Sequence, residues 1–326
     1  GDFVKELLLM YKVAQSLTLK RIDEGSIDFD TREIYFEIDE KGLIKSLGVK
    51  ERLDSMRLVE ECMLLANRCV TEFVSKLQMQ IGKELPFVYR VHDLPDGDKL
   101  HNLTEFIRQF GYKANLKDKN EIRKLLEQVK GKPEEFIIND LLIRSMAKAV
   151  YTNENIGHYG LGFPDYTHFT SPIRRYPDLI VHRLLFAYNN FKNGVDEKLN
   201  INARYLNSLS ETCKHCSVQE QNAVSAEREV KKILQVEFIK DKIGEEFSAI
   251  VSGISRFGLF VEIDDFMIEG MVRYRDIEND YYEYDEKNHC AVGVRKRKVF
   301  RAGDRLKVKL IQANTETRKI DFIIIK

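Results

Sequence analysis

The sequence predicts an α+β protein in which a largely helical part with a small β-meander is followed by a five-stranded barrel. Up to about residue 242, apolar residues recur mostly at three- and four-residue steps, the period of a helix with one buried side. After Gly244 they alternate in five short segments, the period of half-buried strands. We therefore expect a first domain over 1–243 and a second over 244–326.

Helical patterns cover most of the first domain, starting abruptly at the second residue, which leads us to expect further sequence upstream. Asp54 or Ser55 is expected to cap the second helix, and Asp98 the third. The expected helices span 2–21, 54–82, 98–111, 122–131, 133–146, 177–193 and 202–242. Between the first two, 26–50 changes to a period of two, which predicts a three-stranded meander.

The stretch Gly157–Asp178 interrupts this helical part and is a candidate functional loop. It has three glycines, three prolines and five aromatic residues in 22 positions, and it has no apolar period. Such a loop is costly to order, which favours a functional role. Its end places Arg174 and Arg175 directly before a helix that begins at Pro177. A helix N-terminus with two guanidinium groups suits an anion such as phosphate. The alternative is that these arginines pair with structural carboxylates.

Other polar positions have a structural and a functional interpretation. Asp93, Asp96 and Asp98 resemble a metal-binding cluster, but the intervening proline and glycine favour a turn and a helix cap. Cys213 and Cys216 have the spacing of half a zinc site, yet no second ligand pair follows, so we expect a structural role.

Single side chains in helices and strands also leave two interpretations open. Glu60 and Glu61 favour a solvated helix face over a contact to a polar substrate. The charged run 225–229 is expected to face solvent. Phe29 on the first meander strand suits the core, or stacking on a base.

Composition limits the partners and the compartment. Fifty-two basic and 52 acidic residues give no net charge, so any nucleic-acid site must be a local patch. No apolar run approaches the length of a membrane span and the N-terminus lacks the apolar core of a signal peptide, so we expect no membrane contact. Five scattered cysteines do not form a disulfide framework and indicate a reducing, cytoplasmic compartment.

The second domain fits a small barrel of the OB type, because five strands lie within about 80 residues. Arg256, Phe257 and Phe260 stand at a strand start, and Arg295–Lys298 and Arg301 add further cations. Rings that stack on bases and cations that bind phosphate suit single-stranded nucleic acid. The alternative is that the barrel simply needs buried aromatic residues.

The loop also carries a resemblance to a known family. HFTSPIRRYPDLIVHR, with GHYGLGF before it, closely resembles the signature of the RNase R and RNase II (RNB) family of exoribonucleases, nearest to its bacterial RNase R branch. The second domain resembles the OB-fold RNA-binding domain of ribosomal protein S-one. The resemblance covers essentially the whole chain and continues in LVEECMLLAN, RVHDLP, LLIRSMAKAVY, HCS and AEREV.

The resemblance implies roles for individual residues. Arg174 would contact phosphate near the scissile bond, Glu227 would hold the terminal nucleotide, Glu60 would read the sugar 2′-hydroxyl, and Phe29 would clamp the final base. Further RNA contacts are expected from Ser171, Arg175, Arg256, Phe257 and Phe260.

The implied reaction is hydrolytic, processive 3′-to-5′ removal of nucleoside 5′-monophosphates from single-stranded RNA. Family members bind Mg²⁺ through an aspartate cluster that has no counterpart in this sequence. Asp93, Asp96 and Asp98 occupy a different family motif. We therefore expect this chain to bind RNA better than it cuts it, and to need the missing N-terminal part of the protein, in the same chain or another. The alternative is a non-catalytic RNA-binding or scaffold protein.

Overall fold

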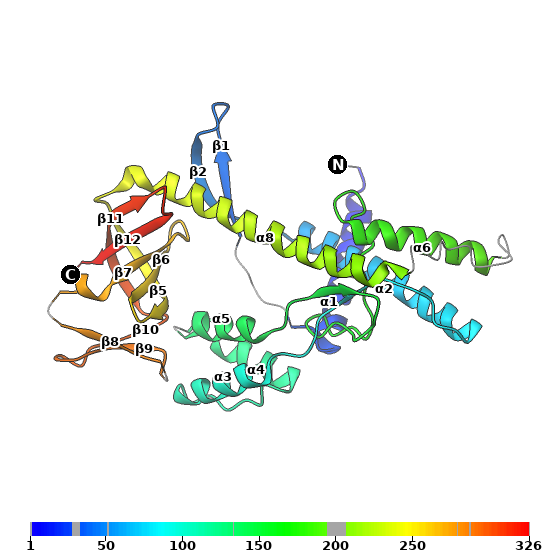
Figure 1. Cartoon of the computed structure of the whole chain (residues 1–326), viewed down its shortest axis with the longest axis horizontal. Coiled ribbons are helices and arrows are strands. Elements are labelled where there is room, and N and C mark those ends of the chain that lie inside the picture. The colour runs from blue at the N-terminus through cyan, green and yellow to red at the C-terminus, as the bar shows by residue number, and fades with distance from the viewer. Residues whose placement is uncertain are drawn as a thin grey trace. The chain divides into compact units, whose positions relative to one another are not determined.

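The computed structural model describes residues 2–27, 33–50, 52–132, 134–193, 207–278, 280–286 and 288–325, and it divides into two compact units. The first unit combines Gly1–Asp28, Arg52–Asp96 and Met146–Val224. The second combines Phe29–Glu51, Gly97–Ser145 and Ser225–Lys326. The long helix α8 (Leu209–Ile239) contributes residues to both (Figure 1).

The first unit consists of α1 (Val4–Asp23), α2 (Asp54–Ile81), the strand pair β3 (Tyr89–Val91) and β4 (Val150–Thr152), α6 (Tyr176–Lys192), and the start of α8. Fully buried side chains from α2, α6 and the segment before β3 form its core, among them Val74, Phe87, Val88, Val181 and Tyr188. As predicted, α2 ends at Gly82, whose φ of 62° is left-handed and suits glycine. No side chain caps α2, however, because Leu53 occupies the N-cap position.

Helix α1 differs from its predicted packing. Its apolar stripe is largely exposed, and Ala14 and Arg21 are its buried residues. Leu8 is 56% exposed and Leu9 is 65% exposed. The periodicity therefore identified the helix correctly, but within the described residues most of its apolar side chains are not buried.

The second unit contains three short helices, α3 (Gly97–Gln109), α4 (Lys119–Val129) and α5 (Glu135–Ser145). Asp98 is the second residue of α3, so the cap predicted there is wrong. The described part of the expected meander is an antiparallel hairpin, β1 (Glu33–Ile38) with β2 (Ile44–Lys50). Ser26 and Ile27, which were expected to start a further strand, are not in one.

The predicted five-stranded barrel is confirmed (Figure 1). Its strands are β5 (Glu246–Ser255), β6 (Gly258–Ile263), β7 (Glu269–Arg273), β11 (Arg305–Asn314) and β12 (Lys319–Ile324). They follow the order β11-β12-β7-β6-β5, and β5 pairs with β11 to close the barrel. Alternate side chains fill the interior, including the fully buried Val251, Val261, Val308 and Phe322.

A separate three-stranded sheet lies between β7 and β11 in sequence and was not predicted. It consists of β8 (Tyr282–Asp285), β9 (Cys290–Gly293) and β10 (Val299–Arg301). Tyr282 on β8 stacks on Tyr274, with ring centroids 6.2 Å apart, and contacts Phe300 on β10 at 5.2 Å. Charged residues surround these strands and obscure the alternation from which they could have been recognised.

Within the described ranges, none of the helices combines the length and apolar content that crossing a membrane requires.

Candidate functional site

The loop Gly157–Asp178 is held in place by backbone hydrogen bonds to β3 and its neighbours. Arg90 N donates to Tyr166 O at 2.9 Å, and His92 N donates to Gly157 O at 3.1 Å. On α2, the Asn67 side chain donates to the Tyr166 hydroxyl at 2.8 Å and accepts from Phe169 N at 2.9 Å. These hydrogen bonds pair polar groups of the loop that no helix or sheet would pair.

The two adjacent arginines at the end of the loop have different environments. Arg175 is the N-cap residue of α6, and its Nη2 donates to Asp178 Oδ1 at 2.7 Å. Arg174 lies in the preceding turn with its side chain exposed, and no ion pair to it is found among the described residues. The structural interpretation therefore holds for Arg175, whereas Arg174 remains available to bind an anion.

Unsatisfied polar atoms gather beside these arginines. Thr170 Oγ1, Arg175 Nε and Asp178 Oδ2 are buried and have no hydrogen-bond partner among the described residues. Asp178 is fully buried, and its other oxygen accepts from Arg175 and from Ser171 N, the latter at 2.8 Å. Buried polar groups normally find partners, so three orphans in one short segment point to a bound ligand or water.

A pocket of about 530 Å³ adjoins this segment within the first unit. It contains two of the predicted site residues, Glu60 and Arg175. Residues of α2 form one side, and the loop contributes the other. The lining consists of Ser55, Met56, Val59, Glu60, Met63, Leu64, Asn67, Tyr166, His168, Thr170 and Arg175.

His168 is a largely buried residue of this pocket with several arginines nearby. Burial lowers its pKa, and the charges of Arg175, Arg90 and Arg174 lower it further, to about 2. The imidazole is therefore neutral at physiological pH. Its Nδ1 lies 2.8 Å from the Tyr151 hydroxyl, and burial raises the pKa of that hydroxyl to about 12. The arginines near this pocket favour an anionic ligand.

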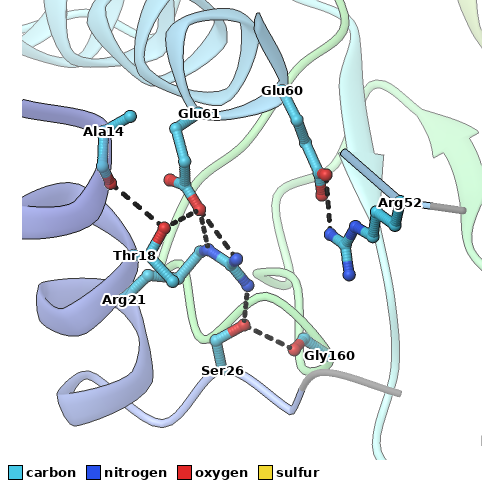
Figure 2. Close-up of polar contacts among 8 residues, drawn as sticks. All are labelled: Ala14, Thr18, Arg21, Ser26, Arg52, Glu60, Glu61 and Gly160. Atoms are coloured by element: carbon cyan, nitrogen blue, oxygen red, sulfur yellow. Dashed lines mark hydrogen bonds and ion pairs between the residues drawn. The ribbon is translucent and has the colours of Figure 1, made fainter. Parts of the chain in front are cut away.

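The neighbouring glutamates Glu60 and Glu61 face different surroundings (Figure 2). Glu60 is half-buried, lines the pocket and pairs with Arg52 at 2.6 Å. Glu61 is 4% exposed and pairs with the equally buried Arg21 of α1 at 2.8 Å. A solvated face was thus the wrong interpretation for Glu61, whose role is structural. Glu60 keeps a position from which it can contact a ligand.

Glu227 lies on α8 in the second unit, where its side chain is 63% exposed. A hydrogen bond from Lys231, at 2.7 Å, lowers the pKa of Glu227. The whole stretch 221–230 is exposed, as predicted for its charged run. The structure thus brings Glu60 and Arg175 together in the first unit, whereas Glu227 belongs to the second unit. Phe29 lies outside the described residues.

A second groove, of about 620 Å³, lies on the barrel. It contains all three residues predicted there, Arg256, Phe257 and Phe260. Phe257 sits in the β5–β6 turn and is 70% exposed, so it does not serve the barrel core. Asp321 Oδ2 fixes Arg273, another lining residue, at 2.7 Å. The groove combines an exposed ring with cations, as single-strand binding requires.

The side chains that the structure describes do not form a metal site. In the described part of the sequence, no group of three or more His, Cys, Asp or Glu side chains lies close enough to hold one. Asp93 is exposed and accepts a hydrogen bond from Leu94 N at 2.7 Å, as in a turn. Cys213 is buried within α8, and burial raises the pKa of its thiol to about 12.

Sequence reasoning missed five polar residues of the first pocket: Ser55, Asn67, Tyr166, His168 and Thr170. Three belong to the loop Gly157–Asp178 and one to LVEECMLLAN, whereas Ser55 was considered only as a helix cap. The sequence shows that these residues are polar. It does not show which of them line the same pocket, because that depends on how the loop folds.

Two family models match the sequence and define its class. An RNB domain matches residues 2–190, and an S1 RNA binding domain matches residues 240–325. The chain therefore belongs to the RNB family and carries an S1 domain after its RNB segment.

The relatives of this chain include bacterial ribonucleases R. It is 36% identical to Ribonuclease R 1 of Lactococcus lactis over 326 residues, which is 99% of this chain and 38% of that protein. It is 38% identical to Ribonuclease R of Aquifex aeolicus, covering 100% of this chain and 45% of that protein. The chain thus spans less than half the length of these two relatives.

A solved structure of Mycoplasma genitalium RNase R in complex with ribose methylated single-stranded RNA has the same fold. The TM-score is 0.88 at 25% identity, over 99% of this chain and 50% of that one.

Proposed function

We propose that this chain is part of a hydrolytic, processive 3′-to-5′ exoribonuclease that releases nucleoside 5′-monophosphates from single-stranded RNA. The observation that carries the proposal is the exposed Arg174 beside a pocket lined by Glu60 and Arg175, with orphaned polar atoms next to it. Relatives named ribonuclease R, and a structural neighbour that holds single-stranded RNA, support the same reading.

Side chains in and beside the first pocket would make different contacts to RNA. Arg174 would neutralise charge on the phosphate next to the scissile bond, where it has no competing ion pair among the described residues. Arg175, fixed by Asp178, and Ser171 would line the path of the same strand. Glu60 would accept a hydrogen bond from a sugar 2′-hydroxyl, the group that distinguishes RNA from DNA.

The remaining predicted contacts lie elsewhere in the chain. Glu227 would hold the terminal nucleotide, and Phe29 would stack on its base. Arg256, Phe257 and Phe260 would guide the incoming strand over the barrel groove. We assign chemistry at the RNA end to the domain over 1–243 and capture of the strand to the domain over 244–326.

Hydrolysis of this kind uses Mg²⁺, which activates water and neutralises phosphate charge when it is bound. The described side chains provide no site for it. We propose that its ligands come from polypeptide outside this sequence, in the same chain or in a second one, and that this chain alone does not cut RNA.

The exposed apolar residues of α1 are the surface we propose for contact with that polypeptide. Leu7, Leu8, Leu9 and Val13 leave more than half of their area exposed on one helix. An apolar surface of this kind usually marks an interaction site.

The alternative is a non-catalytic RNA-binding protein that keeps the RNB fold. The lack of a metal-binding group among the described side chains favours it. It would use the same pocket and groove to bind RNA without hydrolysis.

Incubation with a 5′-labelled RNA and Mg²⁺ tests these two functions. The purified chain is assayed alone, with any polypeptide that co-purifies with it, and as the complete gene product. A short end product that accumulates without a ladder of intermediates, only when the additional polypeptide is present, is the expected result. RNA binding without any degradation by the complete gene product would reject the exoribonuclease in favour of the alternative.

A further inference from the structure

The turn between β9 and β10 presents four basic residues in succession, Arg295–Lys298. All four are exposed. In the part of the chain that the structure describes, no carboxylate forms an ion pair with these side chains. The turn lies outside the barrel groove, whose lining includes none of the four. It is therefore a separate concentration of positive charge within the second unit.

A buried carboxylate holds this turn in shape. Asp280 is 9% exposed and accepts backbone hydrogen bonds from Tyr281 at 2.8 Å, Arg295 at 2.8 Å and Lys296 at 2.7 Å. Gly293 lies against the same carboxylate, because a Cβ there would come within 2.4 Å of Asp280 Oδ2. Backbone N–H groups thus bind the carboxylate, while the four cationic side chains stay exposed. A turn fixed in this way loses little conformational entropy on binding.

An exposed aromatic ring lies beside the cations. Tyr281 is 67% exposed, and the Arg295 guanidinium carbon lies 5.0 Å from its ring centroid. Val294 N donates to Tyr281 O at 2.8 Å, and this hydrogen bond connects Tyr281 to the turn. Cations next to an exposed ring are the combination that binds a single-stranded nucleic-acid backbone and its bases.

The sheet that carries the turn is attached to the wall of the barrel groove. Tyr274 lines the groove and stacks on Tyr282 of β8, which in turn contacts Phe300 of β10. All of these residues belong to the second unit. A strand that leaves the groove therefore has a second cationic surface on the same folded unit.

We infer that the turn Arg295–Lys298, together with Tyr281, is a second contact for the RNA backbone, separate from the barrel groove. It lengthens the stretch of single-stranded RNA that the second unit holds. The inference rests on the proposed function for its ligand, RNA, but it concerns a surface that the RNA-end chemistry does not use.

The test compares oligouridines of two lengths, because one OB-type surface holds roughly 4 to 16 nucleotides. The complete chain is titrated with fluorescein-labelled RNA of about six and about 24 nucleotides at several salt concentrations. The variant Arg297→Gly/Lys298→Ala removes two cations. Glycine suits position 297, where φ is 56°, so the turn keeps its shape.

Each phosphate contact on a single strand contributes about 0.7 to the slope of log K against log salt, or roughly fivefold in affinity at about 0.1 M salt. Loss of two contacts should therefore weaken binding of the longer RNA roughly 25-fold and reduce its slope by about 1.4. Binding of the shorter RNA, which fits the groove alone, should change by less than about twofold.

Three control variants separate this contact from general effects. Arg297→Lys/Lys298→Arg keeps both charges and should retain affinity for both RNAs. Lys76→Ala/Lys83→Ala removes two exposed lysines from the first unit and should leave both affinities unchanged. Phe257→Ala, in the groove, should weaken binding of both RNAs.

Two results would overturn the inference while leaving the proposed function standing. One is an unchanged affinity for the longer RNA in Arg297→Gly/Lys298→Ala, alongside weaker binding in Phe257→Ala. The other is an equal loss for both lengths, which would assign the turn to the groove itself. If the unmodified chain binds neither RNA, the proposed function fails and this inference fails with it.

Discussion

Replacing Glu61 by glutamine tests the buried contact between α1 and α2. Glu61 Oε1 accepts hydrogen bonds from Arg21 Nε at 3.2 Å, Arg21 Nη2 at 2.8 Å and Thr18 Oγ1 at 2.9 Å (Figure 2). Arg21 Nη1 also donates to Ser26 Oγ at 2.6 Å, and that hydroxyl lies 3.5 Å from Gly160 O in the loop Gly157–Asp178. One ion pair thus connects α1, α2 and the loop.

The expected loss of stability is large because the partner stays buried. Glutamine has nearly the same size and can still accept a hydrogen bond, but it leaves the charge of Arg21, which is 5% exposed, without compensation. Removing one partner of a buried ion pair costs about 3–5 kcal/mol. We expect Glu61→Gln to lose about this much of the free energy of unfolding of the first unit.

Glu60→Gln is the matched control one residue away. Its ion pair with Arg52 is half-exposed, and such pairs contribute about 0–1 kcal/mol. Urea unfolding followed by circular dichroism gives the stability, and amide hydrogen exchange in α1 shows whether the loss is local. The double variant Arg21→Met/Glu61→Leu should recover most of the stability, since a buried pair can be replaced by apolar residues. A difference below about 1 kcal/mol between Glu61→Gln and Glu60→Gln would refute this reasoning.

Three further predictions concern the pocket. Glu60→Gln in the complete gene product should reduce the preference for RNA over the matching DNA by roughly tenfold or more, since a hydrogen bond to a charged group contributes about 1.5–3 kcal/mol. An unchanged ratio of the two Kd values would exclude this contact. Arg174→Ala should lower turnover by roughly 100-fold while RNA affinity changes little. A loss of affinity with unchanged turnover in single-turnover assays would argue against a phosphate role at the scissile bond. His168 has a pKa of about 2 because of burial and the charges of Arg175 and Arg90, so below about pH 6.5 the unfolded chain binds a proton that the folded chain does not. The stability present above about pH 6.5 should therefore fall by about 1.4 kcal/mol per pH unit on acidification toward pH 2. In urea titrations at about pH 7 and 5.5, His168→Gln should lack this dependence of stability on pH. An identical pH dependence in both proteins would contradict the prediction.

The sequence by itself determined most of the regular elements. The three- and four-residue period identified the helices, the glycine at position 82 ended α2, and alternation after Gly244 identified the five barrel strands. These are local signals, because helix and strand periods are set by residues close in sequence. The motifs around HFTSPIRRYPD also indicated the RNB family, which the match over residues 2–190 shows.

Only the tertiary structure decided what neighbouring residues do. Glu60 and Glu61 are adjacent and chemically identical, but successive helix positions point about 100° apart. One faces the pocket, and the other faces Arg21, which lies 40 positions away in the chain. Arg174 and Arg175 differ in the same way, because Asp178 reaches only the second of them. The partner of Glu61 is distant in sequence, so no local pattern could assign its role. Asp178 is only three positions from Arg175, and the folded turn decides which of the two arginines it meets.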